Sequence, residues 1–254
     1  WLLARPLQGV STDKRLLLVT HGALAAVPYA ALTSQGKALV ATRTVAHITS
    51  LASFVRKQRA GAAQQSKARG QWASFSHAAD TTAPLPFAAR ESFALGRTMS
   101  RVMVYQQERA TRASLLDALS QPLNVHLATH FRFEGDDPLA SEFSLHDGAL
   151  ALSTVLTHKV RAPLVVLSTC NGGAGVPGAA LHDLPRAFIG AGAGRVVASL
   201  WRISDLGTAL LAKYLFRQLA AGKAPAMALH DAQRELARRH AHPAFWAGLR
   251  VYLR

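Results

Sequence analysis

The segment at 162–173 reads Ala162-Pro163-Leu164-Val165-Val166-Leu167-Ser168-Thr169-Cys170-Asn171-Gly172-Gly173. It is an apolar run of strand length that stops at the only cysteine of the chain and is followed at once by a glycine pair. A short apolar run bounded by turn residues is typical of a buried strand. Open α/β folds place their sites at the carboxyl ends of such strands. The segment therefore predicts a sheet that presents Cys170 at its carboxyl edge.

A second segment has the same form. Leu123-Asn124-Val125-His126-Leu127-Ala128-Thr129-His130 is an apolar strand that ends on a histidine. If the two strands are parallel neighbours, His130 and Cys170 emerge at the same edge of the sheet. A lone cysteine that the fold brings beside a histidine is a candidate nucleophile and base. His126 lies inside the strand, and we expect it to pack in the interior.

Strands alternate with helices along the rest of the chain, which predicts an α/β fold with a mostly parallel central sheet and helices on both faces. Position 249–253 is expected to form an edge strand, and 131–145 to form a loop. The remaining strands are expected at 15–20, 39–46, 71–77, 101–105 and 195–201. The helices are expected at 48–59, 87–95, 110–119, 147–158, 181–190, 204–221 and 225–239.

Length and cysteine content limit the class of protein. The 254 residues suit one large α/β domain. A single cysteine excludes an internal disulfide framework and indicates a reducing, cytoplasmic compartment. No apolar run reaches about 18 residues, so no membrane span is expected. The start at Trp1 does not resemble a signal peptide, and we expect the numbering to begin inside a longer polypeptide.

The chain is strongly basic, with 29 Lys and Arg against 14 Asp and Glu and a net charge of +15. Such a balance fits nucleic acid or an acidic surface as partner. However, the arginines are not interleaved with the aromatic residues that stack on bases, so nucleic acid is not expected as the main ligand. Four carboxylates gather in one segment, which is either a solvated loop or the path of a cationic substrate: Glu134, Asp136, Asp137 and Glu142.

No cofactor or metal is expected. The Gly-rich stretch at 171–178 lacks the Lys-Ser/Thr ending of a phosphate-binding loop. Several histidines have no metal-ligand spacing with cysteines or carboxylates, namely His146, His158, His182 and His230. His21 also ends a strand, and we expect that it can lie near the site.

The chain resembles the CHAT domain, a caspase-like cysteine peptidase domain related to separase and caspases. No single motif is specific to this family. The order and spacing of the motifs, from about residue 15 to 250, are specific when they are taken together. The motifs are Leu16-Leu17-Leu18-Val19, Gly22-Ala23-Leu24, Pro28-Tyr29-Ala30-Ala31-Leu32, Glu108-Arg109-Ala110-Thr111, Val125-His126-Leu127-Ala128-Thr129-His130, Leu145-His146-Asp147-Gly148, Val166-Leu167-Ser168-Thr169-Cys170-Asn171-Gly172, Arg186-Ala187-Phe188-Ile189-Gly190-Ala191-Gly192-Ala193, Ala198-Ser199-Leu200-Trp201, Asp205, Ala228-Leu229, Ala232-Gln233 and His242-Pro243 with Trp246-Ala247.

The resemblance implies a catalytic dyad of His130 and Cys170. It also implies an oxyanion hole formed by the backbone N–H groups of Cys170 and of the residue after the histidine. The family usually has glycine at that second position, whereas this chain has Phe131. A phenylalanine keeps the N–H but adopts fewer backbone conformations than glycine.

Three residues are candidates for substrate binding. Asp205 matches an aspartate that separase-like relatives carry after a Leu-Trp strand, but we favour the alternative that it caps the helix that follows. Ser168 stands two residues before Cys170, where some relatives have an acidic residue. Trp201 is either a wall of the substrate pocket or part of the core.

These features together predict a cysteine endopeptidase that cleaves a protein or peptide substrate. It is expected to be a regulated effector domain of a larger bacterial protein, controlled by a sensor or repeat region or by a partner protein. The alternative is a catalytically silent caspase-like scaffold or protein-interaction module. Within the single domain at 1–254, a smaller pseudo-caspase part is expected at about 1–100 and a catalytic part at about 101–254.

Overall fold

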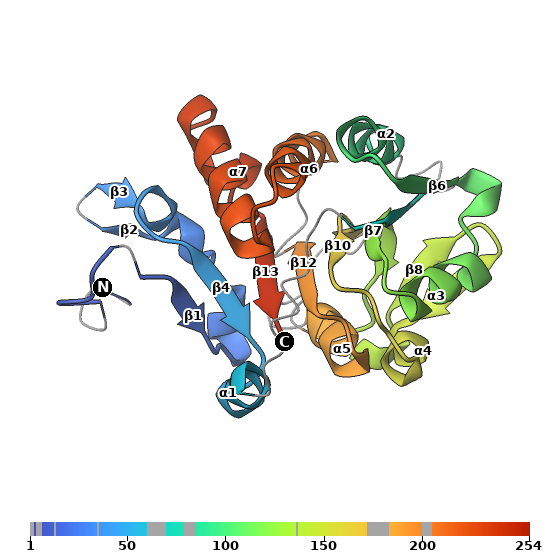
Figure 1. Ribbon diagram of the computed structural model, residues 1–254, viewed down its shortest axis with the longest axis horizontal. Coiled ribbons are helices and arrows are strands. Elements are labelled where there is room, and N and C mark those ends of the chain that lie inside the picture. Colours follow the sequence, from blue (N-terminus) through green and yellow to red (C-terminus); the bar gives the residue numbers. More distant parts are fainter. Residues whose placement is uncertain are drawn as a thin grey trace.

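One twisted sheet runs through the middle of the molecule, and helices cover both of its faces (Figure 1). The computed structural model describes residues 3, 7–12, 14–34, 36–59, 70–78, 85–135, 137–171, 183–199 and 205–254. Across the sheet the strand order is β1 (Leu16–Leu18), β4 (Val45–Ile48), β13 (Leu249–Leu253), β12 (Arg195–Ser199), β10 (Val165–Leu167), β7 (Asn124–Arg132), β5 (Trp72–His77) and β6 (Val102–Gln106).

Three further strands join this sheet beside β7. Strand β11 (Cys170–Asn171) pairs with β7 in parallel, and β8 (Glu142–Leu145) pairs with it antiparallel and forms a hairpin with β9 (Gly148–Ala151). A small separate hairpin consists of β2 (Thr33–Ser34) and β3 (Lys37–Ala38).

The sheet changes direction once along its main path. Strands β1, β4 and β13 run parallel to one another, and β12, β10, β7, β5 and β6 do the same. The two blocks meet antiparallel at β12 and β13, where Arg195 pairs with Leu253 and Ser199 with Leu249. The carboxyl ends of the two blocks therefore lie at opposite edges of the sheet.

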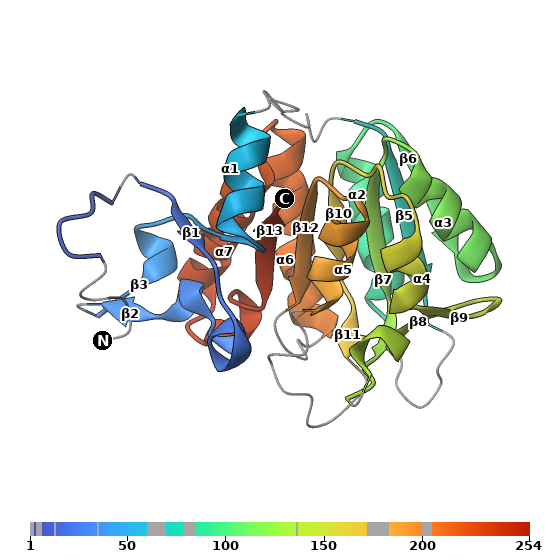
Figure 2. The same cartoon turned by 90° about the horizontal axis from the view of Figure 1, so that it is seen from below.

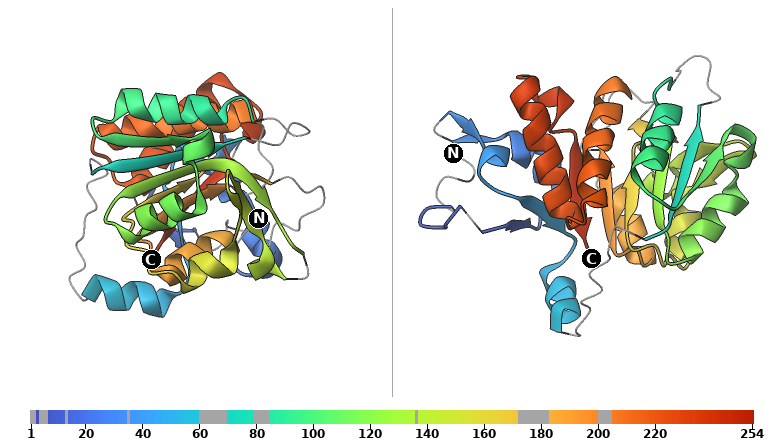
Figure 3. Two further views of the ribbon diagram at one scale, coloured as in Figure 1. Left: turned by 90° about the vertical axis from the view of Figure 1, so that its right-hand side faces the viewer. Right: turned by 45° about the horizontal axis from the view of Figure 1, so that its top comes forward.

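The helices form two layers, which Figures 1 and 3 show on either side of the sheet. One layer holds α1 (Leu51–Arg59), α3 (Arg112–Ser120), α4 (Leu152–Thr157) and α5 (Asp183–Ala191). The other holds α2 (Ala88–Thr98), α6 (Asp205–Ala220) and α7 (Pro225–Arg239).

Strand alternation divides the core between these layers. In β12, Val196 and Ala198 pack in the cluster that contains α3, α4 and α5, whereas Val197 packs with α6 and α7. Successive side chains of a strand point to opposite faces, so a strand buried on both sides has an unbroken apolar sequence. This pattern explains why the apolar runs of the sequence became central strands, and the predicted α/β class is confirmed.

Four local expectations were wrong. Position 147–158 is helical only at Leu152–Thr157, because Gly148–Ala151 forms β9. Position 39–46 forms a 3-10 turn at Leu39–Ala41 before β4 rather than one strand. Position 131–145 is not a loop, because β7 continues to Arg132 and Glu142–Leu145 forms β8. The strand at Leu249–Leu253 is not at the edge, because the chain returns to the middle of the sheet and pairs there with both β12 and β4.

The central position of β13 explains its one charged residue. Arg250 is buried, and its guanidinium donates to the carbonyl oxygens of Ala25 and Val27, each at 2.6 Å. Burial lowers the pKa of Arg250, while Tyr252 and Tyr29 act in the opposite direction. The residue thereby ties the segment after β1 to the last strand of the chain.

No helix within the described part of the chain has the length and the apolar character that crossing a bilayer requires.

The division of the chain into a pseudo-caspase part and a catalytic part at about residue 100 stays a prediction.

A buried polar network links β5 and β7 to α2. The His126 Nε2 lies 3.1 Å from Glu91 Oε2, and its Nδ1 lies 2.9 Å from Ser74 Oγ. Ser74 in turn bonds to Ser92. All four side chains are buried, so each needs a partner that replaces water. The expectation that His126 packs in the interior is confirmed.

Truncating Glu91 should destabilise the fold. Glu91→Ala removes the acceptor of a buried imidazole, and loss of one partner of a buried pair costs about 3 kcal/mol or more. Glu91→Gln keeps an acceptor oxygen and should cost clearly less. Urea unfolding of both variants tests this, with Glu108→Ala on the surface as control. Equal losses for Glu91→Ala and Glu108→Ala would show that the network does not stabilise the fold.

Candidate active site

The site is set by the register between β7 and the strands that follow Ala162. Val165 of β10 pairs with Val125, and Cys170 of β11 pairs with His130, which is the same offset in sequence. The break between β10 and β11 therefore does not shift the ladder. Neighbouring strands lie about 4.7–4.9 Å apart, so the backbones of His130 and Cys170 are immediate neighbours. The predicted juxtaposition of these two residues at one edge of the sheet is present.

The imidazole of His130 is buried and has one nitrogen without a partner among the described residues. His130 is 9% exposed, and its Nε2 has no hydrogen-bond partner among the described residues. A general base needs a free lone pair within reach of the group that it deprotonates. The side chain of Cys170 lies outside the described part of the structure, so the backbone ladder alone locates this residue.

Phe131 is a core residue of a regular strand. Its side chain is buried and packs on Phe143, with ring centroids 4.8 Å apart. Among the non-glycine residues described, the only positive φ is at Gln107, so Phe131 needs no conformation that favours glycine. The N–H of Val125 donates to Leu164 of the cysteine-bearing segment. Since N–H directions alternate along a strand, the N–H of Phe131 points toward the same side, where Cys170 lies.

The other predicted site residues are placed less completely. Ser168 is buried, and its Oγ has no partner among the described residues. Asp205 is the first residue of α6, and its side chain lies outside the described part, so its role as helix cap or substrate-binding residue stays a prediction. Trp201 and the Gly-rich stretch from 172 onward also lie outside it. His21 is not beside His130: its Nδ1 lies 3.0 Å from Arg186, at the edge where β1 ends.

The acidic segment is partly neutralised by one arginine. Arg132, at the end of β7, lies 2.8 Å from Glu142 and 3.6 Å from Glu134. Asp137 accepts a hydrogen bond from the N–H of Leu139. Asp136 lies outside the described residues. Because Glu134 and Glu142 already pair with Arg132, they are less suited to line the path of a cationic substrate. This favours the interpretation of the segment as solvated.

Two histidines that the sequence analysis did not assign to the site are in contact there. His77 ends β5, next to β7, and its ring lies 5.9 Å from that of His146 in an edge-to-face arrangement. Burial, followed by the charges of His146 and His130, lowers the pKa of His77. The signal in the sequence was a third apolar strand that ends on a histidine. Within the described residues, no group of His, Cys, Asp and Glu is arranged to hold a metal ion.

Comparison with known proteins identifies the family of the chain. The model of the CHAT domain matches residues 1–253, which is almost the whole chain. The chain belongs to the CHAT domain family. No curated protein matches its sequence.

Solved structures similar to this CHAT domain are caspase-like cysteine proteases. The Arg-specific cysteine proteinase gingipain R superposes with a TM-score of 0.53 and 10% identity over 84% of this chain and 54% of its own. The complex of the pro- and mature domains of RgpB from Porphyromonas gingivalis superposes with a TM-score of 0.60 and 11% identity, over 99% of this chain and 67% of its own. The separase–securin complex of Saccharomyces cerevisiae superposes with a TM-score of 0.63 and 12% identity, over 94% of this chain and 16% of the matched chain.

At 10–12% identity these similarities establish the caspase-like fold that the sequence predicted. The chain spans about half the length of gingipain R and about a sixth of that of separase.

Restoring the glycine of the family should harm this CHAT domain. Phe131→Gly removes a buried ring from the core and should lower the free energy of unfolding by about 3–5 kcal/mol, the range for loss of a large aromatic side chain. Phe131→Leu keeps most of the apolar volume and should cost clearly less. Chemical denaturation of the two variants measures this difference. If Phe131→Gly were as stable as the parent, the ring would not support the end of β7.

His77 should make the stability depend on pH. Its pKa is lowered in the folded state below the ordinary value of 6.5, so the unfolded chain binds this proton more readily. The free energy of unfolding should therefore fall as the pH decreases below about 6.5 and stay level for this group above it. His77→Gln should reduce the slope measured by urea unfolding between pH 5 and 8. His240→Gln, at the C-terminal end of α7, is the control, and an unchanged slope in His77→Gln would refute the assignment.

Proposed function

We propose that this CHAT domain is a cysteine endopeptidase that uses Cys170 as nucleophile and His130 as proton shuttle. The observation that supports this proposal most is the direct pairing of the two residues across a parallel ladder, at the carboxyl edge where α/β folds place their sites. The free Nε2 of His130 supports it further, because no described residue competes for that nitrogen.

The proposed reaction begins when the Cys170 thiolate attacks the scissile carbonyl carbon. The carbonyl π electrons move to oxygen, and the resulting oxyanion is held by the backbone N–H groups of Cys170 and Phe131. Each such donor is worth about 3 kcal/mol in the transition state. When the C–N bond breaks, protonated His130 gives its proton to the leaving amine. Water, deprotonated by His130, then hydrolyses the thioester and releases the acid and free Cys170.

The surroundings of His130 suit this role electrostatically. Because burial and neighbouring imidazoles lower the pKa of His77, that residue is neutral near pH 7. A neutral His77 does not oppose the positive charge that His130 carries as it protonates the leaving group. General acid–base help of this kind is worth about 10²–10⁴ in rate.

The substrate is proposed to be a protein or peptide chain. Asp205, Ser168 and Trp201 are the candidates for recognising the residue before the cut. Gingipain R is Arg-specific by description, and an acidic side chain at Asp205 would suit such a residue here. Two of the three structural neighbours are complexes with protein partners, a pro-domain and securin. We propose in the same way that a sensor or repeat region, or a partner protein, regulates this domain as an effector within a larger bacterial protein.

A silent scaffold is the second candidate, and the replacement of the usual glycine by Phe131 favours it. The negative φ of Phe131 weakens that argument, since the backbone there does not require glycine. Reactivity of the Cys170 thiol separates the two functions: a peptidase thiol is alkylated rapidly near neutral pH because it is partly ionised, whereas a buried structural thiol is inert.

Cleavage of a mixed peptide library, mapped by mass spectrometry, tests the peptidase proposal. Cys170→Ala should abolish the cuts, and His130→Gln should lower kcat/KM by about 10²–10⁴ because proton transfer is lost. His240→Gln, a histidine outside the site, should cleave at the parent rate. Cuts after Arg or Lys would favour Asp205 as the selecting residue. Cuts that persist at the parent rate in Cys170→Ala would refute the proposal, and an unreactive thiol without any cuts would favour the scaffold.

A further inference from the structure

A cavity of about 350 Å³ lies at the edge of the sheet opposite to His130 and Cys170. Thr49 follows the end of β4 and Arg254 follows the end of β13, and both strands run against β12, β10 and β7. Figure 2 shows this separation: the end of the chain lies beside α1, and β11 lies at the other end of the sheet. The cavity is lined by Thr49, Ser53, Arg56, Arg186, Ile189, Gly190 and Arg254.

Three arginines line this cavity, and no Asp or Glu does. Arg254 donates to the carbonyl oxygen of Gly192 at 2.8 Å, and Arg186 lies 3.0 Å from Nδ1 of His21. Arg56 makes no hydrogen bond or ion pair with any described residue. Since a guanidinium has donors only, each group keeps N–H donors that these contacts leave unused.

The position of Arg254 is fixed by the backbone that it contacts. Gly192 has a φ of +130°, and a Cβ there would lie 2.2 Å from the carbonyl oxygen of Val160. Only glycine fits this turn at the end of α5. The carbonyl that accepts from Arg254 is therefore part of a rigid turn, and this hydrogen bond orients an exposed guanidinium.

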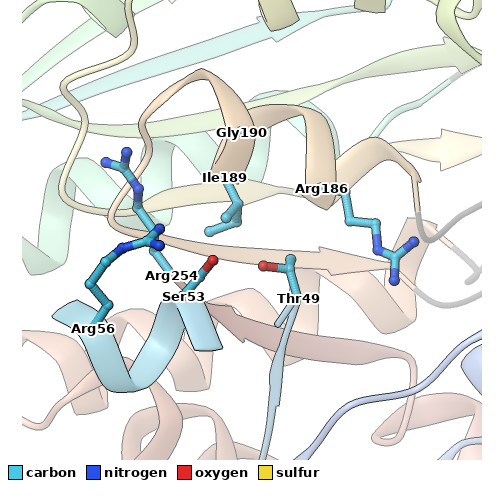
Figure 4. Close-up of a pocket in the computed structure, with 7 residues that line it drawn as sticks. All are labelled: Thr49, Ser53, Arg56, Arg186, Ile189, Gly190 and Arg254. Carbon is cyan, nitrogen blue, oxygen red and sulfur yellow. The ribbon is translucent and has the colours of Figure 1, made fainter. Parts of the chain in front are cut away.

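Hydroxyl groups and a helix start complete the lining. In Figure 4 the hydroxyls of Thr49 and Ser53 point toward one another, with Arg56 and Arg254 beyond Ser53 and Arg186 beyond Thr49. Both hydroxyls belong to the start of α1, whose first turn has no acidic residue. The unpaired N–H groups of a helix start favour an anion. The side chains that line the cavity thus include three cations and no anion.

We propose that this cavity binds a small phosphate-bearing ligand with at least two negative charges, such as a diphosphate group. Arginines bind phosphate through paired N–H donors, and three of them supply more charge than one monoanion neutralises. The volume is at the lower end of the range for small-molecule sites, which favours a compact group over a peptide.

Isothermal titration calorimetry with inorganic pyrophosphate at constant ionic strength tests the site. The parent chain should bind one equivalent, and Arg56→Gln with Arg254→Gln should weaken the Kd at least tenfold. The matched control is Arg101→Gln with Lys213→Gln, which removes two exposed charges remote from the cavity and should change the Kd less than twofold. Arg56→Gln alone should also weaken binding, and it disturbs no described contact that holds the fold.

Further arms of the same experiment identify the source of the phosphate. Tighter binding of ADP than of pyrophosphate would indicate a nucleotide, and equal or weaker binding would indicate a free polyphosphate. Equal weakening in the cavity variant and the control variant would show attraction to the overall charge and overturn the site. Absence of binding at 1 mM pyrophosphate would overturn it as well. Because binding is measured without cleavage, the result is independent of the proposed peptidase activity.

Discussion

The parallel ladder between β7 and the β10–β11 segment is the constraint on which the candidate site depends. Val165 and Cys170 pair with Val125 and His130 at one offset, although the segment leaves regular strand geometry at Ser168. A shift of one residue would turn a strand's side chains to the opposite face. The apolar residues Val165 and Leu167 pack with α5 and prevent such a shift. The burial of these residues, rather than any contact between the catalytic candidates, therefore fixes how His130 and Cys170 meet.

The reversal of the sheet at β12 and β13 separates two chemically different edges. One edge carries histidines and the cysteine strand, and the other carries the arginine cavity. The last strand makes this division possible, because β13 pairs with β4 in one direction and with β12 in the other. Arg250 then connects the strand to the segment after β1. The sequence alone does not reveal this arrangement, since a terminal strand that enters the middle of a sheet has no local signal that distinguishes it from an edge strand.

The features that the sequence predicts are those with a local signal. Strands β7 and β10 are continuous apolar runs, and both end on a chemically distinctive residue, so fold class and the His130–Cys170 juxtaposition followed from them. Strand β8 also had a signal, because Phe143 and Leu145 alternate with half-exposed residues, but its acidic residues resembled a loop. The arginine cavity had none, since its residues come from three separated parts of the chain that meet only through the order of the strands.

Phe131 illustrates why a departure from a family motif has to be judged by what the backbone does. The role that the resemblance assigns to this position belongs to an N–H, which every residue except proline provides. Glycine would be required only if the backbone entered the left-handed region, and it does not do so here. The phenyl ring instead fills the core beside Phe143 and Phe188, which anchors the end of β7 against the β8 strand. The substitution therefore changes how the strand is held in place while its N–H still points toward the strand that carries Cys170.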